Sequence, residues 1–241
     1  MRLLLVAILS TSAVCAAAQP APAPAPGPQA PSYIAAAHLD ATLFLSPPPR
    51  PRSLAQAADL SAVKAAQAGK GGVRWRLAQA DNDISAFTAF GPVLGPAFTR
   101  SAAPRTGALF DVLFADVTSL TVPSKIAFDR PRPPLVDRRL STCAPLEVTR
   151  SYPSGHATRG WLMALVLSEM VPEKSNLLLA RGRDYGDSRV VCAEHFPSDV
   201  QAGRLIGAAV FAAAKSDPAF ERDFQAARLE LRATLGLPPP A

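Results

Sequence analysis

The chain of 241 residues is 49% hydrophobic and 18% charged, with a formal net charge of +6. A chain of this length can form one sizeable core, so we expect one domain. Its Lys and Arg residues are scattered, without the dense basic run or interleaved aromatic residues of a nucleic-acid-binding surface. The composition therefore favours a folded, moderately basic protein without a nucleic-acid-specific site.

The first eighteen residues, MRLLLVAILSTSAVCAAA, have the pattern of a secretory signal peptide. Arg2 precedes an apolar run of about half the ~20 residues that a membrane-spanning helix needs, so we expect no stable membrane span. We place cleavage near Ala18, because small residues end the segment there. Cys15 leaves a lipoprotein signal open, although Val14 is larger than the residue that usually precedes such a cysteine. Cleavage leaves 24 basic and 19 acidic residues, a net charge of +5. We expect the signal to direct the protein to the periplasm or out of the cell.

The next segment, QPAPAPAPGPQAP (19–31), is expected to be an extended linker because of its alternating prolines. Residues 32–241 are expected to form an all-α, single-domain multi-helix bundle, because apolar residues recur every three or four positions and alternating β-branched runs are scarce. Two mostly apolar segments, GWLMALVLSEM and LIGAAVFAAA, are predicted to be central helices. The expected helices span 53–68, 73–80, 81–90, 106–116, 118–129, 156–171, 174–193, 198–214 and 217–234.

Two cysteines, Cys143 and Cys192, remain after removal of the signal peptide. In an oxidising compartment we expect them to form a disulfide. The alternative is two small buried thiols, and a free-thiol count on the unreduced protein distinguishes the two.

The segment KIAFDRPRP contains the first group of candidate site residues, Lys125 and Arg132. Pro131 and Pro133 fix the backbone on both sides of Arg132, so its guanidinium is held on a stiff segment. A guanidinium suits two-point binding of a phosphate, and the Lys ammonium adds a compact positive charge. The alternative is a solvated basic face.

The second group lies in SYPSGHATRGWLMA, where a Pro-Ser-Gly turn precedes a long apolar helix. The backbone N–H groups of Ser154, Gly155 and His156 are expected to point out of the helix start and bind an anion. His156 can donate a proton to a leaving oxygen, because imidazole titrates near neutral pH. The alternative is an ordinary helix start with Ser154 as its cap.

The third group, in DSRVVCAEHFPSD, contains Ser188, Arg189, His195 and Asp199. Pro197 separates two helices, so we expect His195 at the end of one and Asp199 in the first turn of the next, with Ser198 as cap. The carboxylate can then orient one imidazole nitrogen and leave the other free for attack. The alternative is a buried His–Asp pair without catalytic function.

Together the three groups supply the components of phosphoryl transfer without a metal: cations, backbone N–H groups and two histidines. No set of His, Cys, Asp and Glu has the spacing of a metal site. The combination resembles the three-part signature of the type 2 phosphatidic acid phosphatase superfamily. The matching motifs are Lys125-x6-Arg132-Pro133, Pro153-Ser154-Gly155-His156 and Ser188-Arg189-x5-His195-x3-Asp199.

Within that superfamily, the motifs SYPSGHAT and SRVVC, the chain length and the secretory signal are most similar to the class A bacterial non-specific acid phosphatases. This resemblance implies the helical bundle that these enzymes share with vanadium haloperoxidases, and a metal-independent activity on small phosphate monoesters. It also implies that no cofactor is needed and that inorganic phosphate or vanadate inhibits. The sequence does not determine the oligomeric state, and a homo-oligomer is one of the possibilities.

The resemblance also implies a role for each matching residue. His195 attacks phosphorus to form a phosphohistidine, Asp199 orients it, and His156 protonates the leaving group. The phosphoryl oxygens are bound by Lys125, Arg132, Ser154, Gly155 and Arg189. Arg130 falls outside the family spacing, so we expect it to be peripheral.

Two positions depart from the class A pattern, which usually has Gly where this chain has Arg150 and Thr where it has Ala157. Ala at the second position is also common in vanadium-dependent haloperoxidases. That enzyme class is therefore one alternative, and a lipid phosphate or diphosphate phosphatase is another. A third alternative is an inactive anion-binding protein, which would bind phosphate without hydrolysing it.

Overall fold

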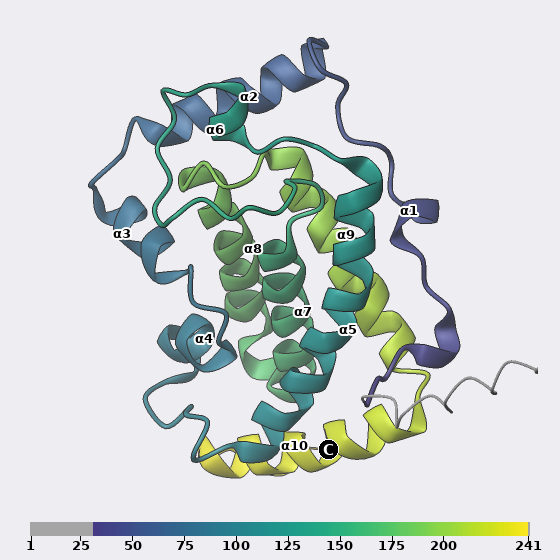
Figure 1. Ribbon diagram of the computed structural model, residues 1–241. Helices are drawn as coiled ribbons and strands as arrows, with labels where there is room; N and C mark the ends of the chain where they lie inside the picture. Colours follow the sequence, from purple (N-terminus) through teal and green to yellow (C-terminus); the bar gives the residue numbers. More distant parts are fainter. Residues whose placement is uncertain (1–30, 241) are drawn as a thin grey trace, which may run out of the picture. The chain divides into compact units, whose positions relative to one another are not determined.

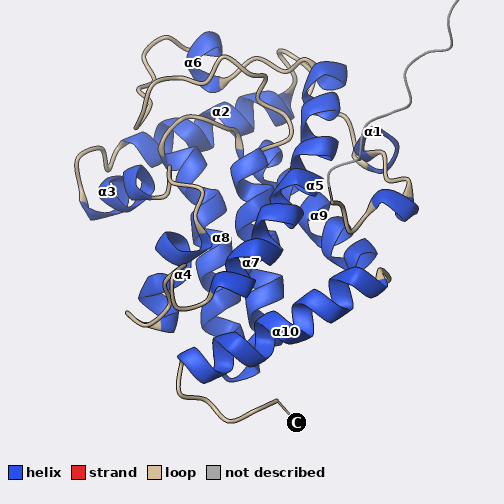
Figure 2. Ribbon diagram, turned by 60° about the horizontal axis from the view of Figure 1, so that its bottom comes forward, coloured by secondary structure: helices blue, strands red, loops and turns tan. Residues whose placement is uncertain are grey.

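The computed structural model describes residues 31–240, where the chain is helical and contains no β-strand. The predicted signal peptide (1–18) lies outside this range, as does the predicted linker except for its last residue, Pro31. The all-α prediction is confirmed (Figures 1 and 2). The 3₁₀ helices are η1 (Ala35–Ala37) and η2 (Pro172–Lys174). The α-helices are α1 (Ala41–Phe44), α2 (Leu54–Gln67), α3 (Val73–Ala80), α4 (Ala86–Leu94), α5 (Pro104–Phe128), α6 (Pro133–Val136), α7 (Gly155–Met170), α8 (Ser175–Val191), α9 (Pro197–Ala214) and α10 (Pro218–Thr234).

Helix α7 lies at the centre of the bundle (Figure 1). It contacts α4, α5, α8, α9 and α10, and Leu162, Met163, Val166 and Leu167 on it are fully buried. The prediction of a central helix is therefore confirmed for GWLMALVLSEM. It is only partly right for the second apolar segment, because α9 buries Ile206 and Val210 but leaves Leu205 half exposed.

Glycines allow the central helices to approach each other closely. A Cβ atom added to Gly182 of α8 would lie 2.4 Å from the Cβ atom of Ala164 on α7. A Cβ atom added to Gly203 of α9 would lie 2.5 Å from the carbonyl oxygen of Ser154, at the start of α7. Since real Cβ atoms do not approach other atoms this closely, only glycine allows the two neighbours to pack at these distances.

Three predicted helices differ clearly from the observed ones. The ranges 106–116 and 118–129 form one continuous helix, α5, because the residue between them is the fully buried Val117 and not a helix-ending Gly or Asn. The helix predicted over 81–90 begins later, at Ala86 of α4, where the Ser85 side chain accepts a hydrogen bond from the Thr88 N–H. Asp81 instead ends α3 and binds Arg181 of α8.

The structure joins Cys143 and Cys192 by a disulfide. Cys143 lies in the long loop between α6 and α7, and Cys192 is the residue at which α8 ends. This bond attaches the loop to the end of the bundle that carries the two histidine motifs.

Helix α10 contacts α5 and α7 across the opposite end of the bundle (Figure 2). Among residues 31–240, none of the helices has the length and apolar character needed to cross a membrane.

Candidate active site

The three sequence motifs meet at one end of the central helices. The last turn of α5 provides Lys125, and the residue before α6 is Arg132. The start of α7 provides Ser154, Gly155 and His156, while Arg189, His195 and Asp199 lie at the end of α8, in the following turn and at the start of α9 (Figure 1). The Ser154 N–H donates to the Asp199 carbonyl at 3.0 Å, which fixes the start of α7 against the start of α9.

Arg189 is a buried cation without acceptors for two of its nitrogens. The side chain is fully buried, yet its Nε and Nη1 atoms make no hydrogen bond within residues 31–240. Burial lowers the pKa of this guanidinium, and the nearby carboxylate of Glu194 offsets part of that effect. A buried guanidinium with free donors is costly unless an acceptor binds it. The site therefore favours an anion at this position.

Arg132 is held rigidly at the other side of the site. It precedes α6 in an extended conformation, with φ −72° and ψ 157°, as the flanking prolines predict. Its Nη1 atom donates to the carboxylate of Glu194 at 3.0 Å and lies 3.3 Å from Nε2 of His195. Its Nη2 atom donates to the carboxylate of Glu147 at 2.5 Å.

Lys125 contributes a second kind of cation. Its ammonium group donates to the carbonyl oxygen of Arg150 at 2.5 Å. Burial, followed by repulsion from Arg132, lowers the pKa of Lys125 to about 8. Lys125 therefore carries its full charge in acid solution and loses it in mildly alkaline solution.

The start of α7 provides two of the three N–H groups that the sequence suggested. Ser154 is the N-cap, and its side chain accepts a hydrogen bond from the Ala157 N–H. Its own N–H is already bound to the Asp199 carbonyl, so the expectation of a free N–H at Ser154 is wrong. Gly155 and His156 are the first two residues of the helix, so their N–H groups have no intrahelical acceptor and can bind an anion.

His156 lies in the first turn of α7 and is almost completely buried. Its Nε2 atom lies 3.3 Å from the carbonyl oxygen of Asn82, which can only accept, so Nε2 carries a proton. Its Nδ1 atom lies 3.9 Å from the Glu147 carboxylate. Burial, together with repulsion from Arg189, lowers the pKa of His156 to about 3. Without a bound anion the ring is therefore neutral at neutral pH, with Nδ1 free to take up a proton.

His195 and Asp199 lie on the two sides of the predicted helix break. His195 Nδ1 is 3.5 Å from Asp199 Oδ2, and its Nε2 lies beside Arg132. Complete burial, then repulsion from Lys125 and Arg132, holds the pKa of His195 well below its usual value. This ring is therefore neutral, as a nucleophilic imidazole requires.

The helix cap at α9 differs from the prediction. The N-cap residue is Phe196 and not Ser198, because Pro197 occupies the first helical position. The Asp199 side chain accepts the Phe196 N–H at 2.8 Å. Its Oδ2 atom also accepts a hydrogen bond from Ser151 Oγ at 2.6 Å. Asp199 thus caps the start of α9 and places a carboxylate 3.5 Å from His195 Nδ1, which makes no hydrogen bond within residues 31–240.

Arg130 is not peripheral, contrary to the expectation from the family spacing. It is buried, and its Nη1 atom donates to Asp199 Oδ1 at 2.5 Å. Its Nη2 atom donates to Asp59 of α2 at 2.7 Å, and its guanidinium packs on the ring of Phe196. The proline after Arg130 was a signal for this rigid placement, but nothing local in the sequence indicated Asp59 as its partner.

Two glutamates that the sequence analysis missed also lie in the site. Glu194 is buried against Arg132, and burial raises the pKa of its carboxyl. Glu147 lies in the loop after α6, with its carboxylate on Arg132 and facing His156. Burial alone would raise the pKa of Glu147, but its interactions with Arg132 first, and then with the two histidines and Lys125, lower it to about 2. In this structure the Glu147 carboxylate is therefore the anion bound in the cationic site.

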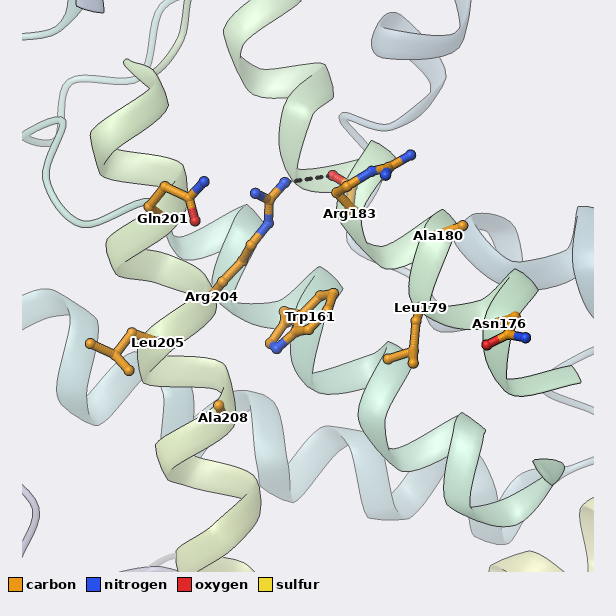
Figure 3. A pocket seen from close by; sticks show the side chains of 9 residues that line it. All are labelled: Trp161, Asn176, Leu179, Ala180, Arg183, Gln201, Arg204, Leu205 and Ala208. Carbon is orange, nitrogen blue, oxygen red and sulfur yellow. Dashed lines mark hydrogen bonds between the residues drawn. The ribbon is translucent and has the colours of Figure 1, made fainter.

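A separate groove of about 690 Å³ lies between α7, α8 and α9 (Figure 3). Arg204 bridges it by donating to the Arg183 carbonyl at 2.9 Å. None of the side chains that line it belongs to the site of the two histidines. The lining residues are Trp161, Asn176, Leu179, Ala180, Arg183, Gln201, Arg204, Leu205 and Ala208.

The site is rich in cations rather than in metal ligands. In the part of the chain that the structure describes, no three His, Cys, Asp or Glu side chains are grouped as a metal site. What the geometry offers is a buried anion position between guanidinium, ammonium and helix N–H groups, next to one oriented imidazole and one imidazole able to accept a proton.

Comparison with known proteins identifies the family. Residues 107–222 match the PAP2 superfamily. The non-specific acid phosphatase of Salmonella typhimurium is 37% identical over 202 residues, which cover 80% of each chain. This chain belongs to the non-specific acid phosphatase family. The acid phosphatase of Zymomonas mobilis is 35% identical over 80% of this chain and 76% of its own, and the non-specific acid phosphatase of Providencia stuartii is 33% identical over 80% and 81%.

Two solved structures have a fold similar to that of this acid phosphatase family member. A bacterial vanadium-dependent iodoperoxidase superposes with a TM-score of 0.58 at 17% identity, over 73% of this chain and 53% of its own. A transmembrane PAP2-type phosphatidylglycerolphosphate phosphatase from Bacillus subtilis superposes with a TM-score of 0.50 at 21% identity, over 76% and 89%. At these identities the likeness establishes a common helical bundle.

Proposed function

We propose that this protein is an acid phosphatase that hydrolyses phosphate monoesters through a phosphohistidine on His195, without a metal ion. The observation that carries the proposal is the buried guanidinium of Arg189. Two of its nitrogens have no acceptor among the described residues 31–240, and it lies in the same site as a neutral, buried His195. An anionic phosphoryl group satisfies the donors of Arg189 and also presents an electrophile to the imidazole. The family relatives named acid phosphatases support the same reaction.

Substrate binding follows from the charges of the site. The phosphoryl oxygens take the place of the Glu147 carboxylate and bind Lys125, Arg132 and Arg189. The N–H groups of Gly155 and His156 add donors at the positive end of the α7 dipole. Because these groups are fixed before the substrate arrives, they can stabilise the charge of the transition state without reorganisation.

The transfer step uses the unprotonated nitrogen of His195, Nε2, which lies 3.3 Å from Arg132 Nη1. Nε2 attacks phosphorus in line with the ester oxygen, and the bond between phosphorus and that oxygen breaks as the new N–P bond forms. The Nδ1 proton faces Asp199, whose carboxylate stabilises the positive charge that develops on the ring. The leaving oxygen takes its proton from Nδ1 of His156.

The proton on His156 is coupled to substrate binding. The ring is neutral in the free site, but a bound phosphoryl anion beside it favours the imidazolium. A phosphate monoester bound as its monoanion brings a proton with it, which His156 can pass to the leaving oxygen. In the second step neutral His156 accepts a proton from water, whose oxygen attacks the phosphohistidine and releases phosphate.

A direct test is the release of p-nitrophenol from p-nitrophenyl phosphate at pH 5 to 7 in the presence of EDTA. We expect denatured wild-type samples to retain an acid-labile phosphoenzyme, and His195→Ala should abolish both this species and turnover. His38→Asn is a matched control, because His38 is exposed and Asn tolerates its positive φ of 46°. Near-normal turnover by folded His195→Ala protein would show that another group is the nucleophile.

The two other enzymatic alternatives can be tested in the same preparation. Halide oxidation by peroxide after loading with vanadate would indicate a haloperoxidase, and hydrolysis restricted to lipid phosphates would indicate a lipid phosphatase. We favour soluble monoesters, because the relatives that match over most of the chain are named non-specific acid phosphatases. We further propose secretion or export to the periplasm, and inhibition by phosphate and vanadate.

A further inference from the structure

Arg159 is a further cation at the edge of the phosphate site, and none of the three sequence motifs includes it. It lies on α7 one turn beyond Gly155 and is half buried. Helical side chains point toward the N-terminus of their helix, and the guanidinium accordingly reaches back to Gly155. A Cβ atom added to Gly155 would lie only 3.3 Å from Arg159 Nη1. The guanidinium thus borders the helix start that is expected to bind the phosphoryl group.

Its position is fixed by one hydrogen bond and one aromatic ring. Arg159 Nη2 donates to Thr118 Oγ1 of α5 at 2.8 Å. The guanidinium also lies 5.7 Å from the centre of the Phe114 ring. These contacts hold the charge in place but do not neutralise it, and no carboxylate forms an ion pair with Arg159 within residues 31–240.

The charge of Arg159 acts on the groups that surround the leaving oxygen. It contributes to the lowered pKa of Lys125 and to that of His156, behind the larger effects of burial. Burial lowers the pKa of Arg159 itself, while Tyr185 and Glu147 offset part of that effect. Because residues three apart on a helix are neighbours, Arg159 lies beside His156, which is the proposed proton donor to the leaving group.

The phosphoryl group under attack already has three cations and the helix N–H groups as ligands. We propose that Arg159 forms a second anion subsite, which binds a phosphate carried by the leaving group. The inference rests on the proposed function and deepens it, because it selects diphosphates and closely spaced bisphosphates among the substrates of the site. With a neutral leaving group, the half-buried guanidinium would keep only its contacts with Thr118 and Phe114, which do not balance its charge.

Binding of two non-hydrolysable ligands tests this subsite without requiring turnover. Methylphosphonate fills the phosphoryl position alone, whereas methylenediphosphonate fills both positions. Calorimetric titration with EDTA present gives the ratio of the two affinities for each variant. Arg159→Gln should lower the preference for methylenediphosphonate by about tenfold, the usual effect of losing a hydrogen bond to a charged group. Arg159→Lys keeps the charge and should give an intermediate ratio.

Arg183→Gln is the matched control, because Arg183 is an exposed arginine on α8 outside the site. Thr118→Val removes only the hydroxyl that holds Nη2, and it should shift the ratio in the same direction with little effect on folding. An unchanged ratio in folded Arg159→Gln and Thr118→Val proteins overturns the subsite. An equal loss of affinity for both ligands also overturns the subsite, because Arg159 would then bind the phosphoryl group under attack.

The same variants separate this inference from the proposed function. Phenyl phosphate and pyrophosphate serve as substrates, with EDTA present. The kcat/KM value for pyrophosphate divided by that for phenyl phosphate should fall about tenfold in Arg159→Gln. Absence of phenyl phosphate hydrolysis by the wild-type protein would contradict the phosphatase proposal. The calorimetric ratio would still decide whether Arg159 binds a second phosphate.

Discussion

At the scale of single residues, Arg130 shows how the oriented histidine is supported. Its guanidinium lies between Asp199 at the start of α9 and Asp59 of α2, and all three side chains are buried. Ser198 Oγ accepts a further hydrogen bond from it at 2.6 Å. Arg130 therefore positions the carboxylate that faces His195, without itself contacting the attacking nitrogen.

Removal of this guanidinium should be costly, because two buried carboxylates lose their partner. We expect Arg130→Gln to lower the free energy of unfolding by about 3–5 kcal/mol, as measured by urea denaturation, and to lower kcat more than it raises KM. Arg138→Gln, at an exposed arginine, is the control. Adding Asp59→Asn to Arg130→Gln should restore part of the stability. If Arg130→Gln lowered the free energy of unfolding no more than the control does, the buried ion pairs of Arg130 with Asp59 and Asp199 would not stabilise the protein as proposed.

Glu147 has the opposite role, because its carboxylate occupies the anion position and must leave when a phosphate binds. Since its pKa is about 2, it stays ionised at every pH above about 3 and competes throughout that range. Its side chain is 41% exposed, so the ion pair with Arg132 is expected to be worth about 1 kcal/mol.

We therefore expect Glu147→Gln to bind inorganic phosphate about fivefold more tightly, as measured by competitive inhibition. The gain should be the same at pH 5 and pH 7. Glu169→Gln, whose carboxylate pairs with Lys215 away from the site, is the control. Weaker phosphate binding by Glu147→Gln would show that this carboxylate supports the site rather than competing in it.

At the scale of the helices, the sequence predicted those with clear boundaries. Ser154 and Pro197 mark the starts of α7 and α9, and both helices lie within one residue of their predicted ranges. The prediction failed at α4 because Asp81 binds Arg181, a partner far away in the chain. Likewise, Glu147 lies in a loop without periodicity, so only the folded structure shows that it reaches Arg132.

The approach of α9 to the start of α7 depends on Gly203. Its missing side chain leaves room for the Ser154 carbonyl, which would lie 2.5 Å from an added Cβ atom. We expect Gly203→Ala to destabilise the protein by about 1–3 kcal/mol and to weaken phosphate binding, because the helix start that binds the anion must move. Thermal unfolding and phosphate inhibition measure the two effects.

Gly69, in the turn after α2, provides the matched control for this substitution. A Cβ atom added there meets no other atom within 4 Å, and its φ lies outside the left-handed region. Gly69→Ala should therefore stabilise the protein by about 0.4–1 kcal/mol and leave phosphate binding unchanged. If Gly203→Ala behaved in the same way as this control, the close contact between α9 and α7 would not be important for the site.

At the scale of the whole molecule, the site is assembled from segments that are distant in sequence. Arg130 binds Asp59, and Arg132 binds Glu194. The two arginines are two residues apart, whereas their carboxylate partners are separated by most of the described chain. The disulfide between Cys143 and Cys192 ties the Glu147 loop to the same end of the bundle. The motifs in the sequence named the groups proposed to bind phosphate, whereas the residues that hold them depend on the packing of all these segments.

This assembly makes phosphate binding depend on pH in a specific direction. Lys125, with its pKa of about 8, is protonated in acid and loses its charge as the pH rises through 8, so phosphate affinity should fall above that pH. Inhibition constants for phosphate measured from pH 5 to 9.5 should show this loss. In Lys125→Arg the guanidinium keeps its charge over that range, so the loss above pH 8 should disappear. If the variant retained the same loss, a group other than Lys125 would be responsible for it.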